Sequence, residues 1–225
     1  MIAVTSSDDD WGYRSTMTTY PPAGGARLND FLDGLPILTR WLPGHRVVWQ
    51  TGQQDGPKQT PASHFTHCSA FAAAVALYLD FYLLRPPEHG ETQLANAQTG
   101  WLSGDESFPG AKSAKDNVWR TLGMSGDSGA LTACQEAANA GQLVLVCYAA
   151  PAPTPGHVAI VRARADGTVD VPIDGPDVIM AGAHNYVSTS MRHAFDNYPL
   201  AWPDNLALFA HDTPLQLVRP HPLES

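Results

Sequence analysis

The hydrophobic pattern changes character along the chain, from helix-like segments to strand-like ones. Residues 68–79 (CSAFAAAVALYL) are apolar on nearly every helical face, which indicates a helix that is buried all round. After Leu143 the chain carries short apolar runs that are typical of consecutive strands. Helices first and strands second predict an α+β domain with a mostly antiparallel sheet. One short helix is expected within 28–42, and further helices over 90–99 and 113–122 and from the N-cap at 128 to 140. Strands are expected over 45–50, 143–148, 158–163, 169–171 and 178–181.

Turn-forming residues set the boundaries of these elements. Residues 1–27 are polar and contain Pro21-Pro22 and Gly24-Gly25, so we expect a flexible lead-in followed by a single domain over 28–225. Ser128 is a suitable N-cap, and Gly141 stands where a helix ends with a left-handed residue. Residues 165–168 (ADGT) predict a hairpin turn.

Composition and charge narrow the class of protein. The chain has 225 residues, of which 44% are hydrophobic, which is typical of a folded protein. Its net charge of −9 argues against binding to nucleic acid or to an anionic membrane, because both need clustered basic residues. The longest apolar run, residues 70–79, is half as long as the roughly 20 residues of a membrane-spanning helix.

The first residues, MIAVTSSDDDWGYRS, carry three aspartates where a secretory signal peptide has a basic start and an apolar core. No Sec-type signal is therefore recognised. We expect a protein that is made in the cytoplasm and that either stays there or leaves by a route that does not read such a signal.

The cysteines supply the first candidate for chemistry. Cys68, Cys134 and Cys147 cannot all be paired and form no CxxC spacing, so neither a disulfide framework nor a structural zinc site is expected. Cys134 and Cys147 fall in mid-helix and mid-strand, as ordinary buried cysteines do. Cys68 begins the most buried helix, where the helix dipole and unpaired N–H groups favour the nucleophilic thiolate.

His157, further along the chain, is the candidate partner of Cys68. His157 follows Pro155-Gly156 and opens a strand, so it can face the start of a helix across a cleft, as a Cys–His pair requires. A third group must hold the imidazole in one tautomer. His184 and Asn185 both qualify by position, and Asn185 is favoured because its carbonyl accepts a hydrogen bond at any pH. Met180 occupies a place where a polar group would equally be expected.

Three segments together resemble the catalytic segments of NlpC/P60-type, papain-like cysteine peptidases. They are HFTHCSAFAAAVA, PGHVAIVRA and IMAGAHNY, within residues 64–79, 142–163 and 177–195. The closest similarity is to bacterial amidase effectors that cut peptidoglycan stem peptides. The resemblance implies a papain-like core in which Cys68 attacks an amide carbonyl and His157 acts as base and then as acid. It also implies a third residue near the next strand, here Asn185, and an oxyanion site at the N–H of Cys68.

Other side chains are candidates for substrate contacts rather than for chemistry. We expect His67 to line the cleft, and we count Trp101 and His184 as substrate-binding, although Trp101 fits a core position equally well. His64, His67 and Cys68 lack the converging partners of a zinc site, so no metal is expected. No glycine-rich phosphate motif is present, and no cofactor is expected.

These observations predict a cysteine amidase or endopeptidase that acts on peptidoglycan stem peptides. The resemblance further implies an antibacterial effector that a specialised secretion system exports to a target periplasm, with a cognate immunity protein as partner. Two alternatives use the same fold. One is a papain-like deamidase or acyltransferase acting on a protein, and the other is a non-catalytic binding module, against which the presence of both Cys68 and His157 argues.

Overall fold

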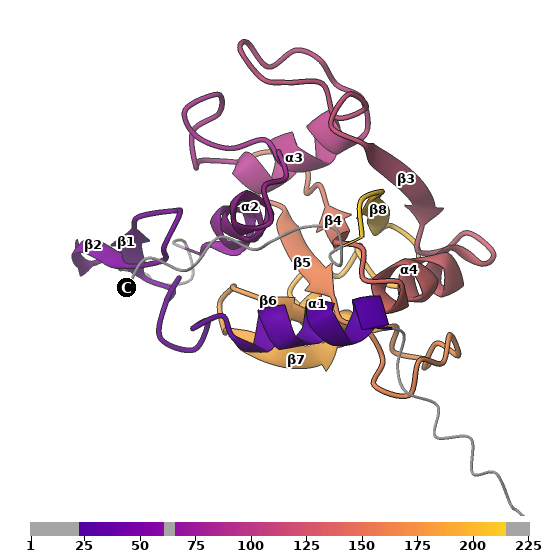
Figure 1. The fold of residues 1–225 in the computed structure, drawn as a ribbon. Coiled ribbons are helices and arrows are strands. Elements are labelled where there is room, and N and C mark those ends of the chain that lie inside the picture. Colours follow the sequence, from indigo (N-terminus) through magenta and orange to yellow (C-terminus); the bar gives the residue numbers. More distant parts are fainter. Residues whose placement is uncertain (1–22, 61–65, 215–225) are drawn as a thin grey trace, which may run out of the picture.

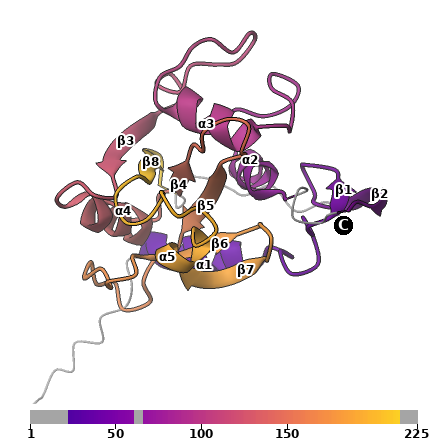
Figure 2. The same ribbon diagram turned by 180° about the vertical axis from the view of Figure 1, so that it is seen from behind.

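A six-stranded antiparallel sheet forms the centre of the structure. The computed structural model describes residues 23–60 and 66–214 (Figures 1 and 2). The strand order is β3-β8-β4-β5-β6-β7, and every neighbouring pair is antiparallel. The strands are β3 (Trp119–Met124), β4 (Val144–Tyr148), β5 (His157–Val161), β6 (Asp177–Met180), β7 (Tyr186–Ser190) and β8 (Ala207–His211). The predicted α+β class with an antiparallel sheet is thereby confirmed.

Apart from one short helix that packs on β6 and β7, the described helices form two groups around this sheet. The helices are α1 (Ala23–Asp33), α2 (Cys68–Tyr78), α3 (Leu94–Leu102), α4 (Ala130–Asn139) and the short α5 (Met191–Ala194). α2 packs with α3 and against β5, whereas α4 packs with α1 and against β3 and β8. A separate hairpin of β1 (His45–Val47) and β2 (Gln54–Lys58) lies beside α2, away from the main sheet (Figures 1 and 2).

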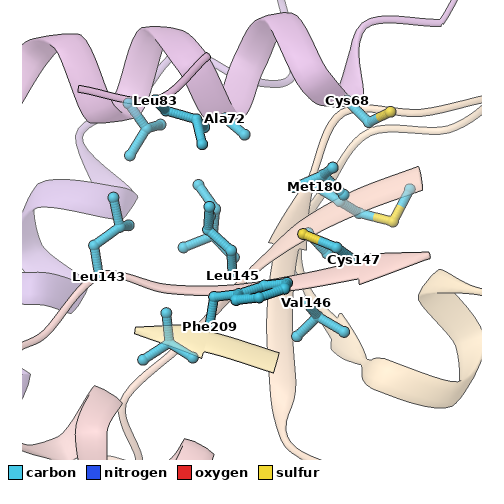
Figure 3. Close-up of a cluster of buried hydrophobic side chains, with 14 of the residues drawn as sticks. Cys68, Ala72, Leu83, Leu143, Leu145, Val146, Cys147, Met180 and Phe209 are labelled. Atoms are coloured by element: carbon cyan, nitrogen blue, oxygen red, sulfur yellow. The ribbon is translucent and has the colours of Figure 1, made fainter. Parts of the chain in front are cut away.

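The core lies around the central strands β4, β5 and β8, which are buried at every position. In Figure 3 the side chain of Leu145 is directed toward the side of β4 on which Ala72 of α2 lies, and that of Val146 is directed away from it. This alternation is the period of an extended strand, so both faces of the sheet centre are covered. Among the described residues, no helix is long and apolar enough to cross a membrane.

The helix that carries Cys68 is formed as predicted. α2 begins at Cys68 and ends at Tyr78, and every residue within it except Leu77 is buried. Its many alanines are small and have the highest helix propensity, so the helix forms readily and approaches the sheet closely. The start of α2 is thereby held against β5.

The expected flexible lead-in is wrong over residues 23–27, because α1 already begins at Ala23; residues 1–22 lie outside the described part. The two glycines of this segment allow close helix contact instead of flexibility. A Cβ on Gly24 would lie 2.3 Å from the carbonyl oxygen of Ala140, and one on Gly25 would lie 2.6 Å from that of Asn139. α1 therefore rests on the end of α4, where no larger side chain fits.

Residues 113–122 do not form the predicted helix. Turns cover 114–118, and β3 begins at Trp119 and pairs with β8. The indole N–H of Trp119 donates to the carbonyl of Tyr82 at 2.7 Å, which fixes the start of this strand in the core. Long-range pairing has overridden the local helical preference here.

Smaller differences concern turns and caps. α4 starts after Gly129 rather than after Ser128, while Gly141 has the predicted left-handed conformation with φ +84°. Residues 165–168 do form a turn, in which Asp166 accepts the N–H of Thr168 at 3.0 Å. No strand forms at 169–171, so this turn does not close a hairpin.

Candidate active site

Cys68 is the first residue of α2, and its side chain is buried, with 4% of the residue exposed. His67 precedes it without capping the helix, because Nε2 of its ring lies 2.8 Å from the carbonyl oxygen of His45 in β1. The N–H groups of Cys68 and Ser69 act directly on the Cys68 sulfur. The start of α2 thus places a thiol beside backbone N–H groups that have no partner within the helix.

Burial governs the ionisation of this thiol. It raises the pKa of Cys68, and the opposing N–H groups of Val158, Ser69 and Cys68 itself do not offset it. The resting group is therefore a thiol, which differs from the thiolate that the helix start alone would favour. Burial likewise raises the pKa of Cys147, and that of Cys134 to about 12. All three cysteines are free.

His157 is the first residue of β5 and is 3% exposed. Its ring stacks on Tyr198 at 5.7 Å between centroids and meets Phe195 edge-on at 5.0 Å. The sulfur of Met180 lies 3.3 Å from Nε2. Burial lowers the pKa of His157 to about 4, so the imidazole is neutral at pH 7.

The two residues approach each other through the start of β5. The N–H of Val158, next to His157, acts on the Cys68 sulfur and lowers its pKa. Tyr198, stacked on His157, also interacts electrostatically with Cys68. Within the described residues, however, no hydrogen bond joins Cys68 directly to His157. The expected pair is adjacent but not hydrogen-bonded in this structure.

Gly156 makes the close approach before His157 possible. A Cβ at this position would lie 2.2 Å from the carbonyl oxygen of Tyr148 and 2.3 Å from Oδ1 of Asn96. The hydroxyl of Tyr198 donates to the carbonyl of Gly156 at 3.3 Å. Glycine is therefore required before His157, because any side chain would collide with the carbonyl of Tyr148.

The structure corrects the expectation for the third residue. Oδ1 of Asn185 accepts the N–H of Gly182 at 3.1 Å, and its Nδ2 donates to the carbonyls of Ile37 and Arg40 at 2.7 and 3.0 Å. These bonds tie the β6–β7 connection to the segment after α1. Among the described residues Asn185 makes no hydrogen bond with His157, and Nε2 of His157 instead faces the sulfur of Met180.

A cavity of about 390 Å³ opens beside Cys68. It lies between the start of α2, the start of α3 and the loop that leads to His157. His67 lines this cavity, as expected. The full lining comprises Thr66, His67, Cys68, Ser69, Glu91, Thr92, Gln93, Leu94, Ala95, Pro155 and Gly156.

Trp101 and His184 do not share this cavity. Trp101 is 2% exposed and donates its indole N–H to the carbonyl of Lys112 at 2.7 Å, so its role is that of a core anchor beside a different cavity. His184 is exposed and lines a third cavity, of about 320 Å³, together with Met180 and Tyr186. The structure therefore does not place either of them as a substrate contact next to Cys68.

Sequence reasoning missed the aromatic residues that enclose His157. Phe195 and Tyr198 follow α5, a four-residue helix that is too short to show a hydrophobic periodicity in the sequence. Glu91 and Gln93, which line the Cys68 cavity, precede α3 in a polar segment whose position relative to Cys68 depends entirely on the tertiary fold. No local pattern in the chain identifies these residues.

Over residues 23–60 and 66–214, no group of three or more His, Cys, Asp or Glu side chains is arranged to hold a metal ion. Comparison of the chain with protein-family models, with curated proteins and with solved structures finds no match. The geometry of the site is thus the basis for any functional proposal.

Proposed function

We propose that this chain is a papain-like, NlpC/P60-type cysteine hydrolase that cleaves an amide bond in peptidoglycan stem peptides. The observation that carries the proposal is the cavity beside Cys68, which is bounded by the start of α2 and by the loop leading to His157. A cysteine at a helix start, packed on an antiparallel sheet with a histidine at a strand start, is the arrangement that the resemblance implies.

The charge states support a mechanism in which the proton moves during attack. A buried thiol and a neutral imidazole are present at pH 7, since burial raises the pKa of Cys68 and lowers that of His157. His157 takes the thiol proton as sulfur bonds to the amide carbonyl carbon. With Nε2 facing the Met180 sulfur, Nδ1 is the nitrogen left to act as the base.

The remaining steps use groups that are already in place. The N–H groups of Cys68 and Ser69 stabilise the oxyanion of the tetrahedral intermediate. As the C–N bond breaks, His157 returns its proton to the departing amine and a thioester remains. Water then hydrolyses the thioester to a carboxylic acid and restores the thiol. Hydrogen bonds of catalytic pairs often form only when substrate is bound, which accords with the lack of a Cys68–His157 hydrogen bond among the described residues.

The test is digestion of purified sacculi, with the released muropeptides identified by mass spectrometry. The wild-type protein should release amide-cleaved products, and Cys68→Ala should release none while keeping the wild-type fold by circular dichroism. Cys134→Ala is the matched control, because it truncates a buried thiol remote from the cavity and should retain turnover. Hydrolysis by Cys68→Ala, or a Cys134→Ala protein that is folded but inactive, contradicts the proposal.

Export by a specialised secretion system to a target periplasm, and inhibition by a cognate immunity protein, belong to the same proposal. They rest on the resemblance to amidase effectors alone. The acidic net charge of −9 gives no general attraction to an anionic cell wall, so substrate recognition must depend on the site itself.

A further inference from the structure

α3 contacts both of the elements that carry the proposed pair. It packs against α2, which begins at Cys68, and against β4 and β5, whose connection leads to His157. Two side-chain amides of this helix, Asn96 and Gln98, bond to the backbone of these two regions. Residues two positions apart on a helix point about 200° away from each other, so one amide can reach the loop while the other reaches the core.

Gln98 holds the first turn of α2 from inside the core. It is fully buried, and its Nε2 donates to the carbonyl of Ser69 at 3.1 Å and to that of Leu84 at 2.9 Å. Ser69 follows the proposed nucleophile, and its N–H acts on the Cys68 sulfur. These two bonds therefore fix the turn of α2 that presents the thiol and its neighbouring N–H groups.

The same side chain carries an unsatisfied acceptor. Oε1 of Gln98 is buried and has no hydrogen-bond partner among the described residues. A buried acceptor without a partner lowers the stability of a fold, and an apolar side chain of the same shape would avoid that loss. The amide at this position is therefore better explained by what its two N–H bonds hold than by the stability of the core alone.

Asn96 holds the β4–β5 connection, which ends at Gly156, immediately before His157. Its Nδ2 donates to the carbonyls of Ala150 and Thr154, both at 3.2 Å, and its Oδ1 accepts the N–H of Ala150 at 3.0 Å. Gly156 lies against the same oxygen, because a Cβ there would be 2.3 Å from Oδ1. One side chain therefore fixes both ends of the loop that leads to the imidazole.

We propose that Asn96 and Gln98 are positioning residues, which hold Cys68 and His157 at the separation from which the thiol proton passes to the imidazole. This inference rests on the proposed function, because it needs the two residues to react as a pair. Over the described residues neither amide lines the cavity beside Cys68, so each acts through the backbone that it holds. Attack depends steeply on geometry, so a small displacement of either element should slow the reaction.

The test measures the reactivity of Cys68 itself, which requires no peptidoglycan substrate. Iodoacetamide forms a carbon–sulfur bond with the thiol and releases iodide, while His157 takes the thiol proton. At pH 7 the rate at Cys68, followed by peptide mass spectrometry, should be about a hundredfold lower in His157→Ala. Asn96→Ala and Gln98→Met should each lower it by about tenfold, as expected when hydrogen bonds that hold the geometry are lost.

Two amides of α4 provide matched controls. Gln135 is fully buried, and its Oε1 likewise has no partner among the described residues. Asn139 donates to the carbonyls of Gly167 and Thr168 and so holds a loop in the manner of Asn96. Neither control residue lines the cavity beside the proposed nucleophile. Gln135→Met and Asn139→Ala should therefore leave the alkylation rate unchanged.

A double substitution separates positioning from a general structural effect. Adding Asn96→Ala to His157→Ala should cause no further loss, because the amide acts only through the imidazole. Rates are compared among variants with the wild-type circular dichroism, and Asn96→Ala carries the test alone if Gln98→Met does not fold. Wild-type reactivity of either folded variant, or an equal loss from Asn96→Ala in both backgrounds, overturns the proposal. Slowed alkylation together with uncut sacculi instead contradicts the proposed function and supports the positioning role.

Discussion

Met180 stands in the position that usually belongs to a polar residue behind a catalytic histidine. Its thioether sulfur is a weak acceptor, so it holds the N–H of Nε2 without stabilising an imidazolium as an amide or carboxylate oxygen does. Burial lowers the pKa of the His157 imidazole to about 4, and the sulfur does not offset this shift. Met180 is therefore a positioning residue in the proposed mechanism.

Replacing this sulfur should change the pH dependence of the reaction. Met180→Gln places an amide oxygen at Nε2 and should raise the pKa of His157, which moves the acidic limb of the kcat/KM profile to higher pH because the base must be neutral. Met180→Leu keeps the volume, removes the acceptor and should lower kcat/KM by roughly tenfold. Met191→Leu, at a buried methionine of α5, is the control for a general packing effect. An unshifted acidic limb in a folded Met180→Gln protein contradicts the positioning role.

At this scale the sequence predicts the two residues of the proposed pair but not the group that lies behind His157. Cys68 and His157 follow from a helix start and a strand start, which are local features. The third position depends on strand phase, because Ile160 pairs with Ile179 and places Met180 opposite Ala159, on the same face as His157. The β6–β7 register also shifts between Val178 and Met180, and such an irregularity has no reliable local signal.

Helices and strands also differ in whether local sequence or long-range pairing determines them. α2 is predictable because nearly all of its residues are apolar, which indicates a helix that is buried on every side. β3 is not, because residues 113–122 become part strand only through pairing with β8, nearly ninety residues later in the chain. The start of α1 is missed for another reason. A glycine pair predicts flexibility, whereas Gly24-Gly25 lies in a helix because it packs closely against the backbone at the end of α4.

Asn185 acts at the scale of elements, as a clamp between the β6–β7 connection and the segment at 37–41. Asn185→Ala leaves the carbonyls of Ile37 and Arg40 without their donor and should lower the free energy of unfolding by about 1–3 kcal/mol, measured by urea denaturation. Asn205→Ala, which removes one exposed bond to the carbonyl of Leu200, should cost less. The folded Asn185→Ala protein should retain turnover. Lost turnover at wild-type stability would instead give Asn185 the catalytic role that the sequence favoured.

For the molecule as a whole, buried histidines link folding to pH. Burial lowers the pKa of both His157 and His211 to about 4. His211 lies at the end of β8, stacked on Phe81 at 3.6 Å and accepting the N–H of Thr213. The two residues are each 3% exposed and lie in different strands of the sheet, so their contributions should be independent.

The sign of the pH dependence follows from the direction of these shifts. An unfolded histidine takes up a proton near pH 6.5 and the folded one only near pH 4, so the unfolded state binds more protons between these values. The contribution of these histidines to the free energy of unfolding is therefore fully present above about pH 6.5 and is lost as the pH falls. For His157 the loss is about 2 kcal/mol at pH 5. Urea midpoints at pH 7, 6 and 5 should decrease in that order. His157→Phe should reduce the slope, whereas His184→Gln, at an exposed ring, should preserve it. An NMR titration of the wild-type protein that places the His157 pKa near 6.5, or midpoints that do not change with pH, would contradict this account of the buried imidazole.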